Sequence, residues 1–62
     1  MGLRLKQVRE RKGVSLRVLA AESGISFTTI HRIEKGEETP RFSTLEKLAK
    51  ALGVSVRDLI EK

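Results

Sequence analysis

The side chains with the most usable chemistry lie between residues 27 and 35. If this segment is helical, at about 100° per residue, four side chains that can donate hydrogen bonds share one arc: Thr28, His31, Arg32 and Lys35. Ile30 and Ile33 fall on the opposite side, and no acidic residue lies on the donor arc. A helix of this width fits the major groove of DNA, where Arg can bond guanine O6 and N7 together and a threonine methyl can contact thymine. From these residues alone, the alternative is a solvated helix face with an exposed histidine.

The sequence offers little for catalysis or metal binding. It contains no Cys and a single His, so it has no thiol nucleophile, and His31 has no second His with which to build a metal site. No Ser, Cys or carboxylate is placed to pair with His31 as a catalytic base. A chain of 62 residues buries only about 60% of the surface of its unfolded form and leaves no room for a deep pocket. We therefore expect one domain over residues 1–62 that is not an enzyme and takes no cofactor, metal or small-molecule substrate.

The excess of basic charge is confined to the first half of the chain. Thirteen Lys and Arg against eight Asp and Glu give a net charge of +5. Residues 1–35 hold eight of the basic and three of the acidic side chains, whereas residues 36–62 hold five of each. This asymmetry indicates a polyanionic partner for the first half, with a solvated basic helix as the alternative. Apolar runs of four residues or fewer predict no membrane-spanning helix and no leader peptide, so we expect a cytoplasmic protein without a membrane partner.

Three repeats of a glycine, a branched aliphatic residue and a serine divide the chain: Gly13-Val14-Ser15, Gly24-Ile25-Ser26 and Gly53-Val54-Ser55. Each repeat can end one helix with a left-handed glycine and begin the next with a serine N-cap. The aliphatic residue then packs against the fourth residue of the new helix. Those fourth residues are apolar in all three cases, namely Leu19, Ile30 and Leu59. Ser55 with Asp58, and Ser43 with Glu46, also have the spacing of a capping box.

These signals predict an all-α chain of five helices. The expected bounds are about Leu3 to Lys12, Leu16 to Ser23, Phe27 to Lys35, Phe42 or Ser43 to Leu52, and Val56 to Glu61. The inward-facing residues at helical spacing are Leu5, Val8, Leu19, Ala20, Ile30, Ile33, Leu45, Leu48, Ala49, Leu52 and Leu59. We expect Phe42 to join this core, and Leu3 and Val18 to face outward. Because only three residues join the second and third helices, these must cross steeply, as in a helix-turn-helix.

The order of these features resembles the lambda-repressor-like, Cro/C1-type (XRE-family) helix-turn-helix domain. The matching residues run over nearly the whole chain: Arg9, Gly13-Val14-Ser15, Leu19-Ala20, Gly24-Ile25-Ser26, Ile30, Ile33-Glu34-Lys35-Gly36, Pro40 and Leu45 through Leu52-Gly53-Val54. The resemblance implies a compact five-helix domain whose recognition helix, about residues 27–35, enters the major groove. It also implies sequence-specific binding of double-stranded DNA by a transcriptional regulator, expected to be a repressor, that acts as a homodimer on a near-palindromic operator.

The resemblance also implies site residues, by position. Contacts to base edges are expected from Phe27, Thr28 and Arg32, and from His31 on the same arc. Contacts to phosphates are expected near Leu16 and Phe27 through backbone N–H groups, and at Ser26, Lys35, Arg41 and, more weakly, Arg17. Arg9 and Glu34 match a pair that joins the first helix to the end of the third. We expect them to form a partly buried ion pair, with two unrelated surface charges as the alternative.

Departures from the family pattern favour a second hypothesis. Leu16 stands where the family commonly has Gln, and Phe27 opens the recognition helix where polar residues are usual. The Phe27 ring either presses on a thymine methyl or belongs to a protein contact. The alternative function is thus a protein-interaction module on the same fold, an antitoxin or a partner-controlled regulator. Val56 and Ile60 lie on one apolar arc of the fifth helix and either contact a second subunit or close the core.

Overall fold

The structure, a computed structural model, describes residues 3–60. They form four α-helices and a short 3₁₀-helix: α1 (Leu5–Arg11), α2 (Leu16–Ser23), α3 (Phe27–Glu34), α4 (Phe42–Leu52) and η1 (Val56–Leu59). The predicted all-α class is confirmed. Lys12 and Lys35, which the sequence assigned to helices, are instead the C-cap residues of α1 and α3. Over residues 3–60, no helix has both the length and the apolar character needed to cross a membrane.

The helix boundaries at the Gly-aliphatic-Ser repeats form as the sequence predicts. The hydroxyl oxygen of Ser15 accepts a hydrogen bond from the backbone N–H of Val18, and Gly24 ends α2 in the left-handed conformation, with φ of 76°. At the last corner, the backbone N–H of Ser55 donates to Asp58 Oδ2 over 3.1 Å. This bond, together with one from the Ser55 hydroxyl, holds the pKa of Asp58 below its ordinary value.

α4 begins at Phe42, one of the two predicted starts, but two other predictions for its first turn were wrong. The capping box of Ser43 with Glu46 was wrong, because α4 begins at Phe42 with Arg41 at its N-cap and no side-chain cap bond. Phe42 was also wrongly assigned to the core, since its residue is 63% exposed. It lies in the first turn, about 70° around the helix from the centre of the inward arc.

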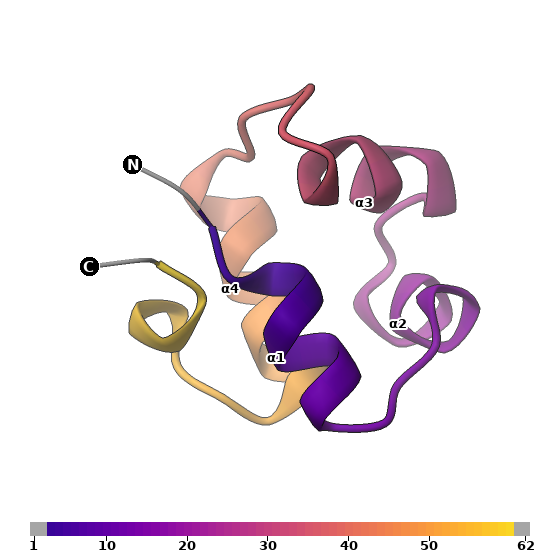
Figure 1. Cartoon of the computed structure of the whole chain (residues 1–62), viewed down its shortest axis with the longest axis vertical. Coiled ribbons are helices and arrows are strands. Elements are labelled where there is room, and N and C mark those ends of the chain that lie inside the picture. The colour runs from indigo at the N-terminus through magenta and orange to yellow at the C-terminus, as the bar shows by residue number, and fades with distance from the viewer. Residues whose placement is uncertain (1–2, 61–62) are drawn as a thin grey trace.

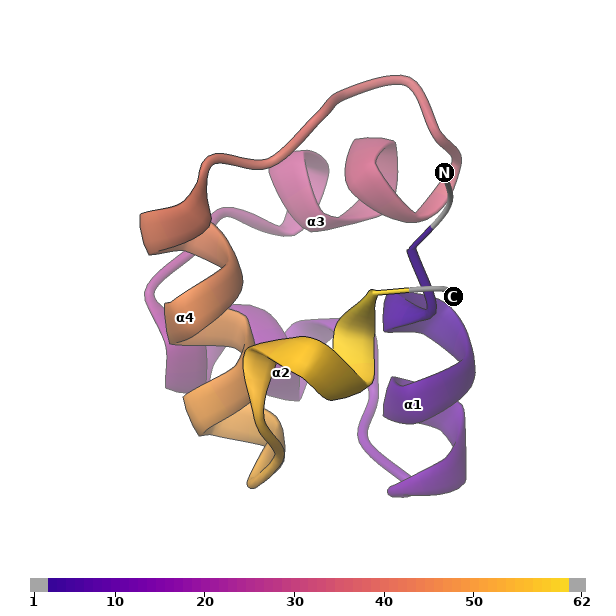
Figure 2. The same ribbon diagram turned by 90° about the vertical axis from the view of Figure 1, so that its left-hand side faces the viewer.

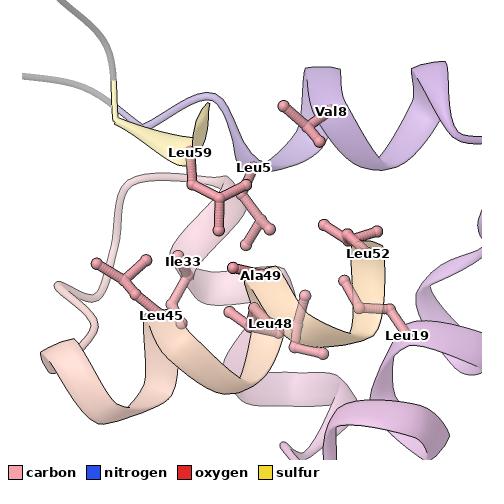
Figure 3. Close-up of a cluster of buried hydrophobic side chains, with 10 residues drawn as sticks. Leu5, Val8, Leu19, Ile33, Leu45, Leu48, Ala49, Leu52 and Leu59 are labelled. Atoms are coloured by element: carbon pink, nitrogen blue, oxygen red, sulfur yellow. The ribbon is translucent and has the colours of Figure 1, made fainter. Parts of the chain in front are cut away.

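The core is one cluster at the centre of the domain, with side chains from all five elements (Figure 3). Ten residues are buried: Leu5, Val8, Leu19, Ile30, Ile33, Leu45, Leu48, Ala49, Leu52 and Leu59. All ten belong to the inward set that the sequence predicts, and Ala20, the remaining member, packs against the cluster half-buried. Val18 is 45% exposed, as predicted. The hydrophobic periodicity therefore located almost the entire core.

The two ends of the described chain pair with each other, which the sequence did not predict. Leu3 and Ile60 form an isolated antiparallel bridge, and the backbone N–H of Arg4 donates to the Leu59 carbonyl oxygen over 2.8 Å. Leu3 is therefore extended and half-buried against the core rather than helical and outward. The same pairing ends the last element after Leu59, so the predicted α-helix is a single 3₁₀ turn; Glu61, its predicted end, lies outside the described residues.

The packing of the helices places α3 toward one end of the molecule. Two perpendicular views place α3 near the top, with α2 below it and the loop to α4 rising above it (Figures 1 and 2). The C-terminal end of α1 lies at the bottom in both views. One face of α3 packs on the core, and its other face is left to solvent.

Candidate nucleic-acid interface

The outer face of α3 gathers the side chains to which the sequence assigned base contacts. Ile30 and Ile33 are buried beneath the helix, at 0% and 3% exposure. The residues on the opposite arc are all exposed: Phe27, Thr28, His31, Arg32 and Lys35. Within residues 3–60, neither Thr28 nor Arg32 has a side-chain hydrogen bond or a carboxylate partner. Both side chains thus have their polar groups available to a ligand outside the chain.

Serine side chains cap the N-terminal turns of α2 and α3. The Ser26 hydroxyl accepts from the backbone N–H of Thr29 over 3.1 Å and donates to the Thr29 hydroxyl over 2.8 Å. The Ser26 side chain is therefore committed to the cap, although its residue remains exposed. The backbone N–H groups of the first two residues of each helix come before the earliest i→i−4 hydrogen bond, so the helix itself supplies no acceptor for them. Such groups, at the positive end of the helix dipole, suit a phosphate oxygen.

The N-terminal turn of α2 contributes one cation and one core contact. The guanidinium carbon of Arg17 lies 5.8 Å from the centroid of the Phe27 ring, within range of a cation–π contact. This contact brings α2 and α3 together at their N-terminal ends. Leu16 is half-buried against the core, so only its backbone is suited to meet a phosphate.

A buried ion pair connects α1 to the end of α3. Arg9 Nε donates to Glu34 Oε2 over 2.7 Å, and Arg9 Nη2 donates to Glu34 Oε1 over 3.2 Å. The two side chains are only 11% and 4% exposed. Arg9 Nη1 also donates to the Val14 carbonyl oxygen over 2.9 Å, which braces the corner between α1 and α2. The bond to Glu34 raises the pKa of Arg9 above its already high value, against the opposing effect of burial.

The loop after α3 places an acidic side chain beside one of the basic residues. Lys35 Nζ lies 3.3 Å from Glu37 Oε2, and each side chain is about half exposed, at 53% and 54%. Glu37 therefore partly neutralises one of the three cations assigned to phosphates, whereas Arg17 on α2 and Arg41 at the start of α4 are exposed. An exposed pair of this kind contributes little stability and exchanges readily for another partner.

The two residues considered for a subunit contact are both half-buried within this chain. Val56 packs against the core cluster, and Ile60 takes part in the bridge to Leu3. Part of each side chain therefore has an intramolecular role. In the described part of the chain, no three His, Asp or Glu side chains converge as metal ligands would.

Two features of this surface escaped the sequence reasoning. The ring of Phe27 stacks on the ring of His31, with centroids 6.4 Å apart and planes 25° from parallel, while Arg17 contacts the same ring. The spacing of four residues between Phe27 and His31 is a signal that was available, because side chains at i and i+4 meet on a helix. The contact from Arg17 joins two helices, so no local spacing reveals it.

Comparisons with known proteins agree with the fold. A helix-turn-helix family profile matches residues 5–59. The transcriptional regulator SinR of Bacillus subtilis is 38% identical over 63 residues, which cover all of this chain and 57% of SinR. The crystal structure of the restriction-modification controller protein C.AhdI from Aeromonas hydrophila superposes with a TM-score of 0.88 at 33% identity, covering 92% of this chain and 86% of that one.

A further solved structure, the SinR protein/SinI protein complex, matches with a TM-score of 0.87 and 37% identity over 95% of this chain and 58% of that one. The chain spans between 33% and 57% of the lengths of the curated regulators that lead the comparison.

Proposed function

We propose that the chain binds double-stranded DNA in a sequence-specific manner, because it belongs to the Cro/C1-type helix-turn-helix family. The members of this family are DNA-binding domains rather than enzymes. The chain then acts as a single domain of a transcriptional regulator, with repression as the expected effect. The observation that carries this proposal is the exposed arc of α3, on which Thr28 and Arg32 have no side-chain partner among residues 3–60. Such a regulator acts in the cytoplasm, where it has access to DNA.

In the proposed complex, α3 lies in the major groove. Arg32 bonds guanine O6 and N7, which is the commonest base-specific contact in that groove, and Thr28 contacts the neighbouring base edge. Phe27 lies on the same face at the start of the helix, and His31 lies about one turn further along. The Arg9–Glu34 pair fixes the end of α3 relative to α1, so it positions the reading side chains without touching DNA.

Phosphates on either side of the groove set the register of the domain. Backbone N–H groups at the starts of α2 and α3, around Leu16 and Phe27, hold one strand with the help of the helix dipoles. Ser26 supports this contact through its cap. The phosphates also meet three basic side chains, those of Lys35, Arg41 and Arg17.

A two-fold arrangement on a near-palindromic operator completes the proposal. A monomer this small contacts only a few base pairs, whereas two copies on half-sites about one helical turn apart read enough sequence to be selective. The exposed parts of Val56, at the start of η1, and of Ile60, which follows it in extended conformation, are the proposed subunit contact.

A second function, binding of a partner protein on the same fold, is favoured by a specific observation. Two phenylalanine rings are exposed, Phe27 at 44% and Phe42 at 63%. Aromatic rings are enriched in the buried centres of protein interfaces. A solved relative is itself a complex of a regulator with another protein.

The test begins by selecting bound duplexes from a random pool and titrating the selected and a random duplex at several salt concentrations. Each phosphate contact should contribute about 0.9 to the slope of log affinity against log salt. Arg32→Ala should weaken the selected duplex by about 1 to 3 kcal/mol and leave the random duplex nearly unchanged.

Arg11→Ala is the matched control, because Arg11 is exposed and ends α1 far from α3 (Figures 1 and 2). It removes the same charge and should affect both duplexes slightly and equally. Equal losses from Arg32→Ala on both duplexes would refute base reading by Arg32. The absence of salt-dependent binding to any duplex would favour the partner-protein function instead.

A further inference from the structure

The ring of Phe27 is exposed but held by its neighbours. Its residue is 44% exposed at the first position of α3. The Arg17 guanidinium carbon lies 5.8 Å from the ring centroid, and the His31 ring stacks on it at 6.4 Å with planes 25° apart. One contact comes from α2 and the other from the next turn of α3, so together they restrict the rotation of the side chain.

The Phe27 ring lies outside the core cluster. It does not pack against the core, although two core residues are close in sequence: Ile25, which is half-buried, and Ile30, which is buried. A cation–π contact and an aromatic pair both favour particular orientations of the ring. The ring is therefore held ready for an apolar group that approaches from outside the chain.

We infer that Phe27 recognises the 5-methyl group of a pyrimidine, thymine or 5-methylcytosine, in the major groove. The inference rests on the proposed function and names one feature of the DNA that α3 reads. The thymine methyl is the only apolar group that the unmodified base pairs present in the major groove, and Phe is among the side chains that contact it. 5-Methylcytosine carries its methyl group on the same ring carbon, so the same ring surface fits both bases.

The surroundings of the ring favour DNA over a protein as the source of this apolar group. Arg17 and His31 touch the ring, and Arg32 and Lys35 share the exposed face of α3. No acidic residue lies on that arc of the helix. A protein partner would have to bury the guanidinium groups of Arg17 and Arg32 against its own acidic groups, whereas the phosphates on both sides of a major groove supply negative charge wherever the methyl group lies.

The position of Phe27 also separates its target from that of Arg32. The two residues are five apart, which places them about 140° from each other around the helix. They therefore face opposite edges of the exposed arc, with Thr28 between them. The methylated pyrimidine and the guanine are consequently different base pairs, and the two contacts can be tested independently.

The experiment measures affinity for the selected duplex with single atoms changed. Each thymine is replaced in turn by deoxyuridine, which removes only the methyl group. Burial of one methyl group is worth about 0.8 kcal/mol, or roughly a fourfold change in affinity. We expect this fourfold loss at one thymine or more with the wild-type protein. At that position, 5-methylcytosine paired with guanine should bind about fourfold more tightly than cytosine paired with guanine.

Phe27→Ala identifies the residue that reads the methyl group. With this variant, both the thymine–deoxyuridine and the 5-methylcytosine–cytosine ratios should fall to about one, while Phe42→Ala, which removes the other exposed ring, should leave both ratios at their wild-type values. Melting temperatures of the two variants establish that each is folded.

Several results would overturn the inference. A methyl effect that persists in Phe27→Ala would assign the contact to another side chain, such as the methyl group of Thr28. Tight, sequence-selective binding with no methyl effect at any pyrimidine would refute the inference and leave the proposed function intact. A methyl effect for thymine but not for 5-methylcytosine would refute the shared recognition of the two bases. Failure to bind any duplex would refute the proposed function together with this inference.

Discussion

Replacing Glu34 with glutamine removes one charge from the ion pair that joins α1 to α3 and changes little else in shape. In the native chain, the Glu34 carboxylate accepts two hydrogen bonds from the Arg9 guanidinium, at 2.7 and 3.2 Å. Glutamine keeps one oxygen acceptor but turns an amide N–H₂ group toward the donors of Arg9. The guanidinium then stays mostly buried, at 11% side-chain exposure, without a compensating charge.

The expected cost follows from this burial. Removing one partner of a buried ion pair costs about 3 to 5 kcal/mol. The cost should be nearer 2 to 3 kcal/mol in this case, because Arg9 retains its bond to the Val14 carbonyl oxygen and some access to water. For a domain of this size, that loss lowers the melting temperature by about 10 to 20 °C. Since so small a core supplies only about 3 to 5 kcal/mol in total, part of the variant should be unfolded at room temperature.

Urea and thermal unfolding followed by circular dichroism measure this effect. Glu22→Gln, which changes an exposed glutamate on α2, is the matched control and should shift stability by less than about 0.5 kcal/mol. A double variant with Met at positions 9 and 34 should recover much of the loss, because apolar side chains of similar volume often replace a buried pair without cost. If Glu34→Gln proved as mild as Glu22→Gln, the pair would behave like a surface ion pair and the reasoning would be refuted.

Three further predictions concern the corners and the basic surface. Gly24→Ala should destabilise by about 1 to 2 kcal/mol through backbone strain alone, since Gly24 has φ of 76° and no atom lies within 4 Å of the added Cβ; an unchanged melting temperature would contradict this. Asp58 has a lowered pKa, so the stabilisation by its bonds to Ser55 is complete above its ordinary value of 3.8 and is lost as the pH falls through the lowered value. Asp58→Asn should therefore be less stable than the wild type at neutral pH, and the two should converge in acid; a constant difference down to the lowest pH would argue against the capping bond. Glu37→Gln should release Lys35 from its ion pair, raise the affinity for any duplex and steepen the salt slope by about 0.9; identical titrations of variant and wild type would exclude Lys35 as a phosphate contact.

Features determined by local chemistry could be read from the sequence. The Ser15 and Ser26 caps depend on residues three apart, and the fourth residue after each cap is buried as the staple requires. These interactions are satisfied within one turn of helix, so no distant contact overrides them. The same local rules failed at Phe42, which is exposed in the first turn of α4, about 70° from the centre of the inward arc.

Features that depend on distant residues could not be read in the same way. The bridge between Leu3 and Ile60 forms because the folded core brings both ends of the described chain together. It shortens the first helix and reduces the last to a 3₁₀ turn. On the candidate interface, the exposed arc of α3 followed from periodicity, whereas the contact of Arg17 with Phe27 required the crossing of α2 and α3. The Arg9–Glu34 contact, 25 residues apart, was predicted only through resemblance to a family and not from spacing.

The central claim is that the exposed arc of α3 reads bases in the major groove, and methylation interference tests it most directly. The selected duplex is treated sparingly with dimethyl sulfate, which methylates guanine N7 in the major groove and adenine N3 in the minor groove, and bound and unbound fractions are compared. We predict that N7 methylation of one guanine or more excludes a duplex from the bound fraction, and that Arg32→Ala removes this exclusion. Interference confined to adenine N3, or none at guanine N7 in a site that contains essential guanines, would contradict the account.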